Sequence, residues 1–192
     1  MFEAISGLSA AFGLSGSAGL NAYIPLLVVA LAARFPVSDP LVKLQAPYDL
    51  LGSWWAIGLI AVLLVVEIVA DKIPAVDSVN DGIQTFVRPA AGAILFAGSA
   101  NVITDIHPLL SLAAGLLLAG GVHATKAAAR PIVTVSTAGV GNPVVSTLED
   151  IVATVVSLLA VLLPIIAAVL LLSLLLLVIV TIRRWRRRKM VM

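Results

Sequence analysis

Two acidic side chains near the end of a long apolar run are the first candidates for chemistry. Glu67 and Asp71 are four residues apart, so on a helix they lie on the same face. A carboxylate inside hydrocarbon is costly, and such groups usually belong to an ion or proton path with a nearby cation. The alternative is that they lie at the level of the lipid headgroups and are solvated by water. The available partner cations are Lys72, Arg88, Lys126 and Arg130.

A second group of charges follows a helical pattern in residues 76–88. Apolar side chains recur on one face of this segment, and Asp77, Asp81 and Arg88 mark the other face. If the polar stripe faces the other helices, it predicts a site for a cation or a polar headgroup. If it faces water, the segment is an ordinary interfacial helix. We expect Pro89 to end or kink this helix.

The segment "TAGVGNPVVSTLED", residues 137–150, combines helix-breaking and polar residues directly before a long apolar run. Asn142 precedes a proline and is biased away from helical conformation, while Ser146, Glu149 and Asp150 are expected to begin the next helix. Such a break can present backbone carbonyl groups to a cation, and a helix N-terminus can bind an anion. Acidic residues occupy the positive helix end themselves, which favours a cation or proton. The alternative is a structural turn.

The first apolar run contains a similar break. Residues 4–33 carry no charge, but "GLSGSAGLNAYIP" interrupts them with glycines, a proline and Asn21. We therefore predict a broken or kinked first span. Asn21 joins the candidate site because its side chain could face the same cavity as the break at Asn142.

The two histidines are separated by the fourth apolar segment. His107 and His123 are 16 residues apart, too far to bind one metal ion from a single straight helix. His123 precedes Lys126 by three residues and could relay protons. The alternative is a hydrogen-bonded histidine at a helix end. No metal can be named from this pattern.

Composition restricts the class of protein. Of 192 residues, 61% are hydrophobic and 11% are charged, and the mean hydropathy is +1.14, which is typical of a membrane protein. Cysteine is absent, which excludes disulfides, thiolate nucleophiles and cysteine-based metal sites. The sequence contains no phosphate-binding loop, zinc-protease motif or dinucleotide fingerprint, so no cofactor is expected.

We predict an all-α fold, a polytopic transmembrane bundle of about five spans that forms a single domain over residues 1–192. About 20 apolar residues cross the hydrocarbon core of a bilayer. The predicted spans are residues 4–33, 53–72, 90–106, 108–126 and 151–182, with residues 131–148 as a re-entrant or extended segment. The last run is longer than a bilayer needs, and Pro164 offers a kink within it.

The end of the chain is strongly basic. "RRWRRRK", residues 183–189, directly follows the last apolar run. This pattern favours a cytoplasmic anchor, with residues 183–192 as a basic tail on the inner side of the membrane. The alternative is a patch that binds anionic lipid or nucleic acid, but no nucleic-acid partner is expected.

Three stretches also resemble a known family. "GLNAYIPLLVVALAAR", "EIVADKIPAVDSVND" and "TVSTAGVGNPVVSTLED" occur in this order before a leucine-rich last helix. Together they are similar to the bacterial membrane-protein family called domain of unknown function 4126, over nearly the whole chain. The resemblance implies a multi-pass protein of the bacterial cytoplasmic membrane. It implies no activity and supplies no catalytic residues.

Three functions fit these observations. The first is a small transporter or channel-like protein for a small solute or ion, coupled to protons or cations and expected to be a homo-oligomer. Its site would lie between Asn21, the charged end of the second span and residues 142–150. The second is a membrane enzyme acting on lipid headgroups through Asp77 and Asp81 with Arg88 or Lys72. The third is a structural or accessory subunit. We favour the first, which is not an enzyme.

Overall fold

The regular structure of the chain is helical. The computed structural model describes residues 2–35, 44, 46–99 and 107–164, and singly residues 166, 169, 173, 176, 177 and 180. In these residues there are six α-helices, one short 3-10 helix and no strand, which confirms the all-α prediction. The elements are α1 (Phe2–Ala18), α2 (Tyr23–Arg34), η1 (Tyr48–Gly52), α3 (Trp54–Ala70), α4 (Pro74–Ser99), α5 (Pro108–Thr137) and α6 (Asn142–Leu162).

Two helices of the described part, α5 and α6, are long and apolar enough to cross a membrane. The apolar helices α2 and α3 are shorter, with 12 and 17 residues. At about 1.5 Å per residue, α3 is roughly 26 Å long, close to the thickness of the hydrocarbon core. The number of spans therefore stays a prediction, while α3 matches the expected second span closely.

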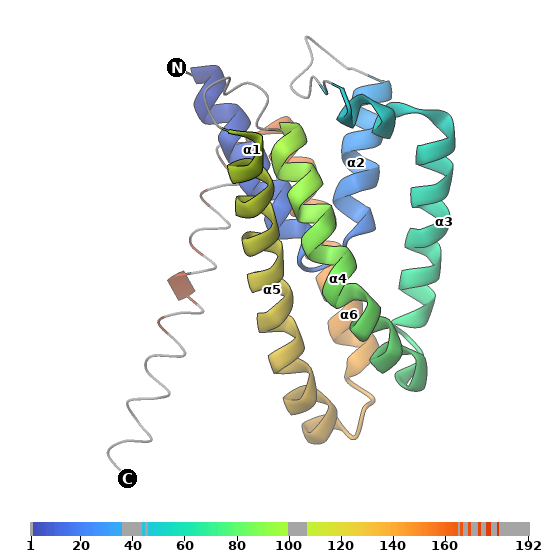
Figure 1. Ribbon diagram of the computed structural model, residues 1–192. Coiled ribbons are helices and arrows are strands. Elements are labelled where there is room, and N and C mark those ends of the chain that lie inside the picture. Colours follow the sequence, from blue (N-terminus) through green and yellow to red (C-terminus); the bar gives the residue numbers. More distant parts are fainter. Residues whose placement is uncertain are drawn as a thin grey trace.

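The predicted break in the first apolar run is confirmed, but the chain reverses there. After α1 ends at Ala18, residues 19–22 turn the chain, and α2 runs back to the end of the bundle where α1 began (Figure 1). The Asn21 side chain stabilises the start of α2, because its Oδ1 accepts hydrogen bonds from the backbone N–H groups of Tyr23 and Ile24 at 3.0 and 3.1 Å. The run is therefore a helical hairpin and not one kinked helix.

The expectation that Pro89 separates an amphipathic helix from the third span is wrong. α4 is a single helix of 26 residues with Pro89 inside it. Proline removes only one backbone donor, and neighbouring helices in a bundle can compensate for that loss. Here α4 packs very closely against α5, because a Cβ added at Gly92 would collide with the Ala119 side chain. Residues 100–106, the predicted end of this span, lie outside the described residues.

The prediction of a re-entrant or extended segment at 131–148 is also wrong. α5 continues through Pro131 to Thr137, and α6 begins at Asn142. Only residues 138–141 leave the helices, where Ala138 and Gly139 have positive φ angles of 50° and 84° and reverse the chain. The β-branched residues at the end of α5 are compatible with a helix, because the Thr134 and Thr137 hydroxyls donate to carbonyl groups four residues earlier.

The last apolar run is not one helix over 151–182. α6 ends at Leu162, and Leu163 leaves helical conformation with φ −140° and ψ 65°. The break falls at the residue before Pro164, where a helical conformation is disfavoured by contact with the proline ring. Most of residues 165–192 lie outside the described residues, including the predicted basic tail at 183–192.

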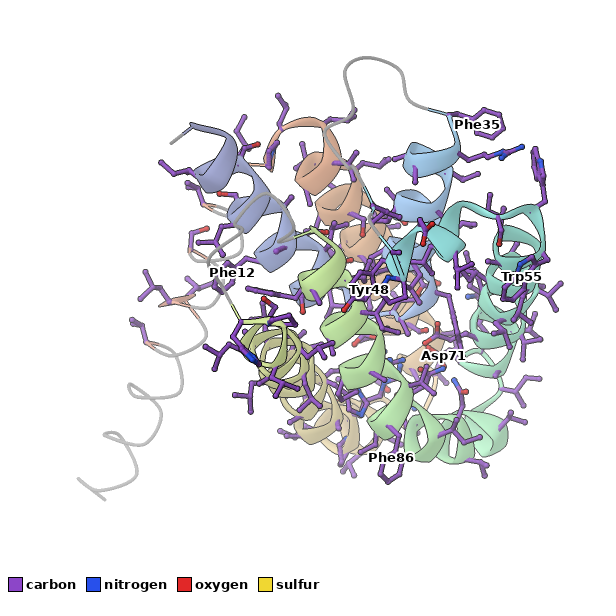
Figure 2. The ribbon with its side chains drawn as sticks, turned by 45° about the horizontal axis from the view of Figure 1, so that its top comes forward. Phe12, Phe35, Tyr48, Trp55, Asp71 and Phe86 are labelled. Atoms are coloured by element: carbon purple, nitrogen blue, oxygen red, sulfur yellow. The ribbon has the colours of Figure 1, made fainter. Side chains whose placement is uncertain are left out.

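Large apolar side chains cover much of the outside of the bundle, whereas several charged side chains are buried inside it. Phe86 and Val135 are 79% and 84% exposed, whereas Arg88 and Glu67 are 0% and 1% exposed. Figure 2 shows Phe86 and Trp55 pointing away from the bundle and Asp71 lying between helices. In water-soluble proteins charged residues are almost never fully buried unless they are paired. An apolar outside around a charged inside is typical of helices that face lipid.

Candidate functional site

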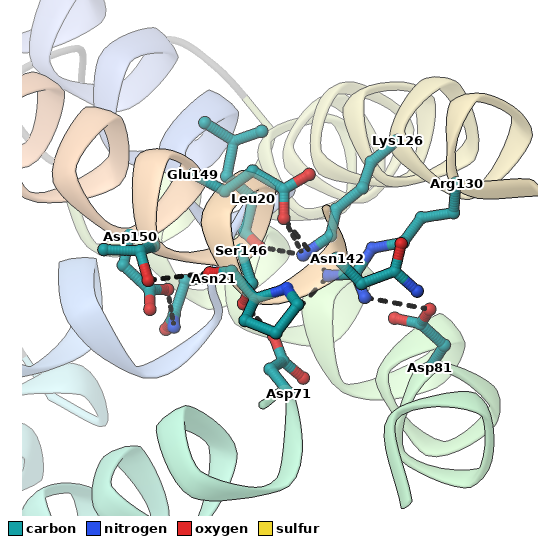
Figure 3. Close-up of polar contacts among 12 residues, drawn as sticks. Leu20, Asn21, Asp71, Asp81, Lys126, Arg130, Asn142, Ser146, Glu149 and Asp150 are labelled. Atoms are coloured by element: carbon teal, nitrogen blue, oxygen red, sulfur yellow. Dashed lines mark hydrogen bonds and ion pairs between the residues drawn. The ribbon is translucent and has the colours of Figure 1, made fainter. Parts of the chain in front are cut away.

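Buried polar side chains gather inside the bundle, around the turn between α1 and α2 and the end of α3. With the exposed Thr85 and the backbone of Leu20 they form three groups of contacts. We name these the arginine centre (Glu67, Thr85, Arg88 and His123), the lysine centre (Asp71, Lys126, Arg130, Ser146 and Glu149) and the hairpin tip (Leu20 and Asn21). Figure 3 shows the lysine centre and the hairpin tip side by side.

The arginine centre joins α3, α4 and α5 through one chain of hydrogen bonds. Arg88 Nη2 donates to Glu67 Oε1 at 3.0 Å, and Arg88 Nη1 lies 3.0 Å from His123 Nδ1. Because a guanidinium can only donate, His123 Nδ1 is the acceptor. The hydrogen of the neutral ring is then on Nε2, which lies 3.1 Å from the Thr85 hydroxyl. His123 thus holds the buried arginine in place.

Three polar atoms of this region are buried without a hydrogen-bond partner among the described residues. They are Glu67 Oε2, Gln84 Oε1 and Arg88 Nε. Gln84 is one helical turn before Arg88 on the same face of α4. Tyr23, at the start of α2, interacts electrostatically with Glu67 and Arg88, so α2 lies on this side of the centre.

The lysine centre connects α5 to α6 and to the hairpin tip. Lys126 Nζ lies 2.8 Å from Glu149 Oε2 and donates to the backbone carbonyl of Leu20 at 3.1 Å. Arg130 Nη2 donates to the same Glu149 oxygen at 3.2 Å. One carboxylate of α6 therefore binds two cations of α5, and one of these cations also binds the end of α1.

Asp71 forms the second acidic side of the lysine centre. Its Oδ1 accepts from Asn80 Nδ2 at 2.8 Å, and its Oδ2 accepts from the Ser146 hydroxyl at 3.1 Å. Arg130 Nη2 lies 3.8 Å from Asp71 Oδ2, and Arg130 Nη1 lies 4.0 Å from Asp81 Oδ2. These contacts tie the α3–α4 turn to α5 and α6.

The hairpin tip contacts α6 through an amide and a carboxylate. Asn21 Nδ2 donates to Asp150 Oδ1 at 2.9 Å, while Asn21 Oδ1 caps α2. Asn21 is 1% exposed, and Asp150 is half-buried. The tip thus presents the Leu20 backbone carbonyl and the Asn21 amide to the charged interior.

Carboxylates outnumber cations in this interior. Among the described side chains of the centres and their direct contacts there are five carboxylates and three permanent cations, while His123 is neutral. The carboxylates are Glu67, Asp71, Asp81, Glu149 and Asp150, and the cations are Arg88, Lys126 and Arg130. The described interior therefore contains two more acidic groups than permanent cations, which favours a proton or a small cation over an anion.

Most of the predicted site residues lie together. Eight of them contact one another or a shared partner, namely Asn21, Glu67, Asp71, Asp81, Arg88, Ser146, Glu149 and Asp150. Glu67 and Asp71 are 1% and 2% exposed, so they are not solvated at a membrane surface. Arg88 and Gln84 are buried, so this stripe of α4 faces the other helices and not water.

Three residues of the predicted site either make other contacts or have a side chain that is not among the described ones. Lys72 is exposed, and its ammonium donates to the carbonyl of Ile68 in the preceding turn. Asn142 is buried, but its Nδ2 donates to the Thr134 hydroxyl at 3.0 Å at the α5–α6 turn. The side chain of Asp77 is outside the described residues.

The sequence-based site omitted the polar face of α5. His123, Lys126 and Arg130 follow a spacing of three and four residues, which places them on one face of the helix. All three are buried. The sequence-based prediction treats Lys126 and Arg130 only as counter-ions and His123 as a relay or a helix-end residue. Their common spacing was the signal that could have grouped them.

Metal binding has no support from the described side chains. No three or more histidine, aspartate or glutamate residues among them are placed to hold a metal ion. His107 instead caps α5, because its Nδ1 accepts from the backbone N–H of Leu109 at 3.2 Å. Carboxylate and imidazole side chains are groups that exchange protons and stabilise a positive charge.

Comparison with known proteins places the chain in a family without assigning a role. The family model described as "Domain of unknown function (DUF4126)" matches residues 8–184. No curated protein and no solved structure matches the chain.

Proposed function

We propose that this chain, which belongs to the DUF4126 family, is a small integral membrane protein that passes a proton or another small cation across the bilayer. The observation that carries the proposal is the position of the helical hairpin. Its tip ends inside the bundle and contacts a buried interior that is rich in carboxylates. Irregular backbone at membrane depth is tolerated where protein covers it or where it lines a cavity, and in transporters such breaks form ion sites.

This function requires a membrane, and the apolar surface of the bundle supports a membrane location. Apolar side chains cover the outside of α3 and α4, while the charges lie inside. We place the protein in a bacterial cytoplasmic membrane, as a multi-pass homo-oligomer with its C-terminus on the cytoplasmic side. The bilayer and a small cation are the partners in this proposal, and no catalytic reaction is part of it.

A lipid-headgroup enzyme has less support. The cations suggested for it were Arg88 and Lys72. Arg88 is fully buried and bound to Glu67, and Lys72 donates to its own helix. Of these two cations only Lys72 is accessible, and Arg88 is held inside the bundle by a carboxylate, so the two cannot bind one headgroup together.

The test is ion flux through purified protein in liposomes. We expect a flux of protons or of monovalent cations above that of protein-free liposomes, driven by an imposed membrane potential. Asp150→Asn keeps an oxygen that can accept from Asn21 but removes the charge beside the hairpin tip. We expect this variant to lower the flux, while Asp49→Asn, an exposed acid in η1, leaves it unchanged.

Two results would refute the proposal. One is the absence of any proton, sodium or potassium flux above the protein-free level from correctly folded protein. The other is a flux in Asp150→Asn and in Asn21→Ala that equals the wild-type flux, because the hairpin tip would then play no part in passage.

A further inference from the structure

We infer that the ion that enters this interior is a proton and that His123 Nδ1 is the atom that binds it. When the proton binds, Arg88 leaves His123 and forms a second hydrogen bond to Glu67. This inference rests on the proposed function and deepens it, since it names the ion and the binding atom. It concerns the arginine centre, whereas the proposed function rests on the hairpin tip.

The contacts of the His123 ring leave one lone pair for a proton. The Thr85 hydroxyl donates its only hydrogen to the Asp81 carbonyl group at 2.9 Å, so it is an acceptor toward His123 Nε2 at 3.1 Å. Arg88 Nη1, 3.0 Å from His123 Nδ1, can only donate. Both contacts define the same neutral ring, with a hydrogen on Nε2 and a lone pair on Nδ1. A proton therefore binds at Nδ1, where it competes with Arg88.

A proton and Arg88 cannot use this lone pair together. The charged ring would direct an N–H group at a guanidinium 3.0 Å away, without an acceptor between them. His123 and Arg88 are 4% and 0% exposed, so water does not screen the repulsion between two positive groups. Binding of the proton thus requires Arg88 to move off the ring.

The unpaired atoms of the arginine centre show where Arg88 can move. Its Nη2 already donates to Glu67 Oε1 at 3.0 Å, while Arg88 Nε and Glu67 Oε2 are buried without a hydrogen-bond partner in the described structure. The N–H groups of Nε and Nη2 lie on one edge of the guanidinium and match the two oxygens of a carboxylate. A small shift toward Glu67 converts the single bond into this two-point contact. Gln84 Oε1, also unpaired, takes no part in the exchange.

Charged groups from four helices surround the ring and define what protonation changes. They are Asp81 and Arg88 of α4, Lys126 and Arg130 of α5, Glu67 of α3 and Glu149 of α6. Because the described interior contains more acidic groups than permanent cations, an imidazolium brings its charge closer to balance. The proton arrives from water, an N–H bond forms on Nδ1, and no other covalent bond changes.

A metal ion fits the same place poorly. Among the described residues, no three histidine, aspartate or glutamate side chains are placed to hold one. The Arg88 guanidinium beside His123 Nδ1 would also repel a metal ion. A proton needs only the one lone pair, and its arrival offers Arg88 a second bond to a carboxylate.

NMR spectroscopy can observe the ring directly, because the chain has only two histidines. In protein labelled with nitrogen-15 at histidine and arginine, His107→Gln and Arg88→Lys assign the signals. We expect His123 Nδ1 to become protonated as the pH falls from about 8 to about 5. The Arg88 Nε signal should shift over the same pH interval, because this group then bonds to Glu67. Glu67→Gln removes the accepting oxygen and should abolish the shift of the arginine signal.

Flux in proteoliposomes tests whether this proton is the one that passes. His123→Gln keeps a side-chain oxygen that can accept from Arg88 but cannot take up a proton. Proton flux should therefore fall by about a hundredfold, the size expected when a proton-transfer group is lost. The matched control is His107→Gln, at an exposed histidine that caps α5, and it should leave the flux unchanged.

The outcomes separate this inference from the proposed function. Flux of sodium or potassium without proton flux would overturn the inference and leave the proposed function standing. Flux of no ion would overturn both. Wild-type proton flux in His123→Gln would overturn the inference alone, as would a His123 ring that stays neutral while the protein conducts protons. If His123→Gln does not fold, the NMR experiment decides, and an Arg88 signal that does not change together with the His123 ring refutes the exchange.

Discussion

Replacement of Arg88 by leucine is the sharpest test of the buried ion pair. Arg88 and Glu67 are 0% and 1% exposed, and their charged atoms are 3.0 Å apart. Arg88→Leu leaves the Glu67 carboxylate inside the bundle without a counter-ion and removes the donor to His123 Nδ1. Breaking a buried pair in this way costs about 3–5 kcal/mol. We therefore expect the free energy of unfolding to fall by about this amount at neutral pH.

The measurement is equilibrium unfolding in mixed micelles, followed by the helical circular dichroism signal as the fraction of denaturing detergent rises. The double variant Glu67→Leu/Arg88→Leu removes both charges, and replacing a buried pair with apolar residues is often close to neutral. It should therefore be more stable than Arg88→Leu alone. Arg34→Leu is the matched control, because Arg34 is exposed and stacks on Trp54, a contact worth about 0.5–1 kcal/mol.

The pH dependence of the single variant has a defined sign. At acidic pH the unpaired Glu67 of Arg88→Leu takes up a proton and becomes neutral, so the loss of stability should shrink as the pH falls. A loss below about 1 kcal/mol, the size of an exposed ion pair, would contradict the reasoning. A double variant no more stable than the single variant would contradict it as well.

Three further predictions concern packing, the hairpin and the orientation of α3. Gly115→Ala should lower the free energy of unfolding by about 1–3 kcal/mol, because the Cβ of the new alanine would collide with the α4 backbone. Gly121→Ala is the control in the same unfolding assay. A Cβ there meets nothing within 4 Å, so this variant should be neutral or stabilising. Ser17→Ala removes hydrogen bonds of 2.8 Å to the Ala153 carbonyl and to the Ser157 hydroxyl, and should cost about 1–3 kcal/mol in that assay, with exposed Ser136→Ala as the control. Because the chain has no cysteine, Asp49→Cys and Lys72→Cys can be labelled singly in sealed vesicles with a membrane-impermeant maleimide. We expect the two positions to react from opposite sides, and labelling from the same side would show that α3 does not cross.

Local spacing was enough to predict part of the site. Glu67 and Asp71 are one helical turn apart, so their common face follows from the helix alone. Their partners do not follow from it. Arg88 reaches Glu67 only because α3 and α4 pack antiparallel after a short turn, and Asp150 reaches Asn21 across 129 residues. Which helix faces meet is decided by the packing of the whole bundle, and no local pattern contains that information.

The errors in the fold have a common physical origin. Pro89 was expected to end or kink a helix and residues 131–148 to be re-entrant or extended, yet α4 and α5 each continue through a proline. The rule that proline ends or kinks a helix considers only the lost hydrogen bond and the steric contact within that helix. In a bundle the neighbouring helices also hold the backbone in place. Gly19, Asn21 and Pro25 correctly predicted a break in the first run. The reversal after it depends on the packing of α2 against α3 and α6, which the break itself does not specify.

The long-range bonds of the hairpin also set an order of assembly during synthesis. Ser17 binds residues 136 and 140 positions later, and Asn21 binds a residue 129 positions later. At about 5–20 residues per second, the ribosome needs roughly 6–26 s to make the chain between Asn21 and its partner Asp150. The hairpin is thus made well before its partners in α6. A nascent chain that stops after α5 lacks Asp150 and Ser157, so docking of the hairpin is completed only when α6 has been made.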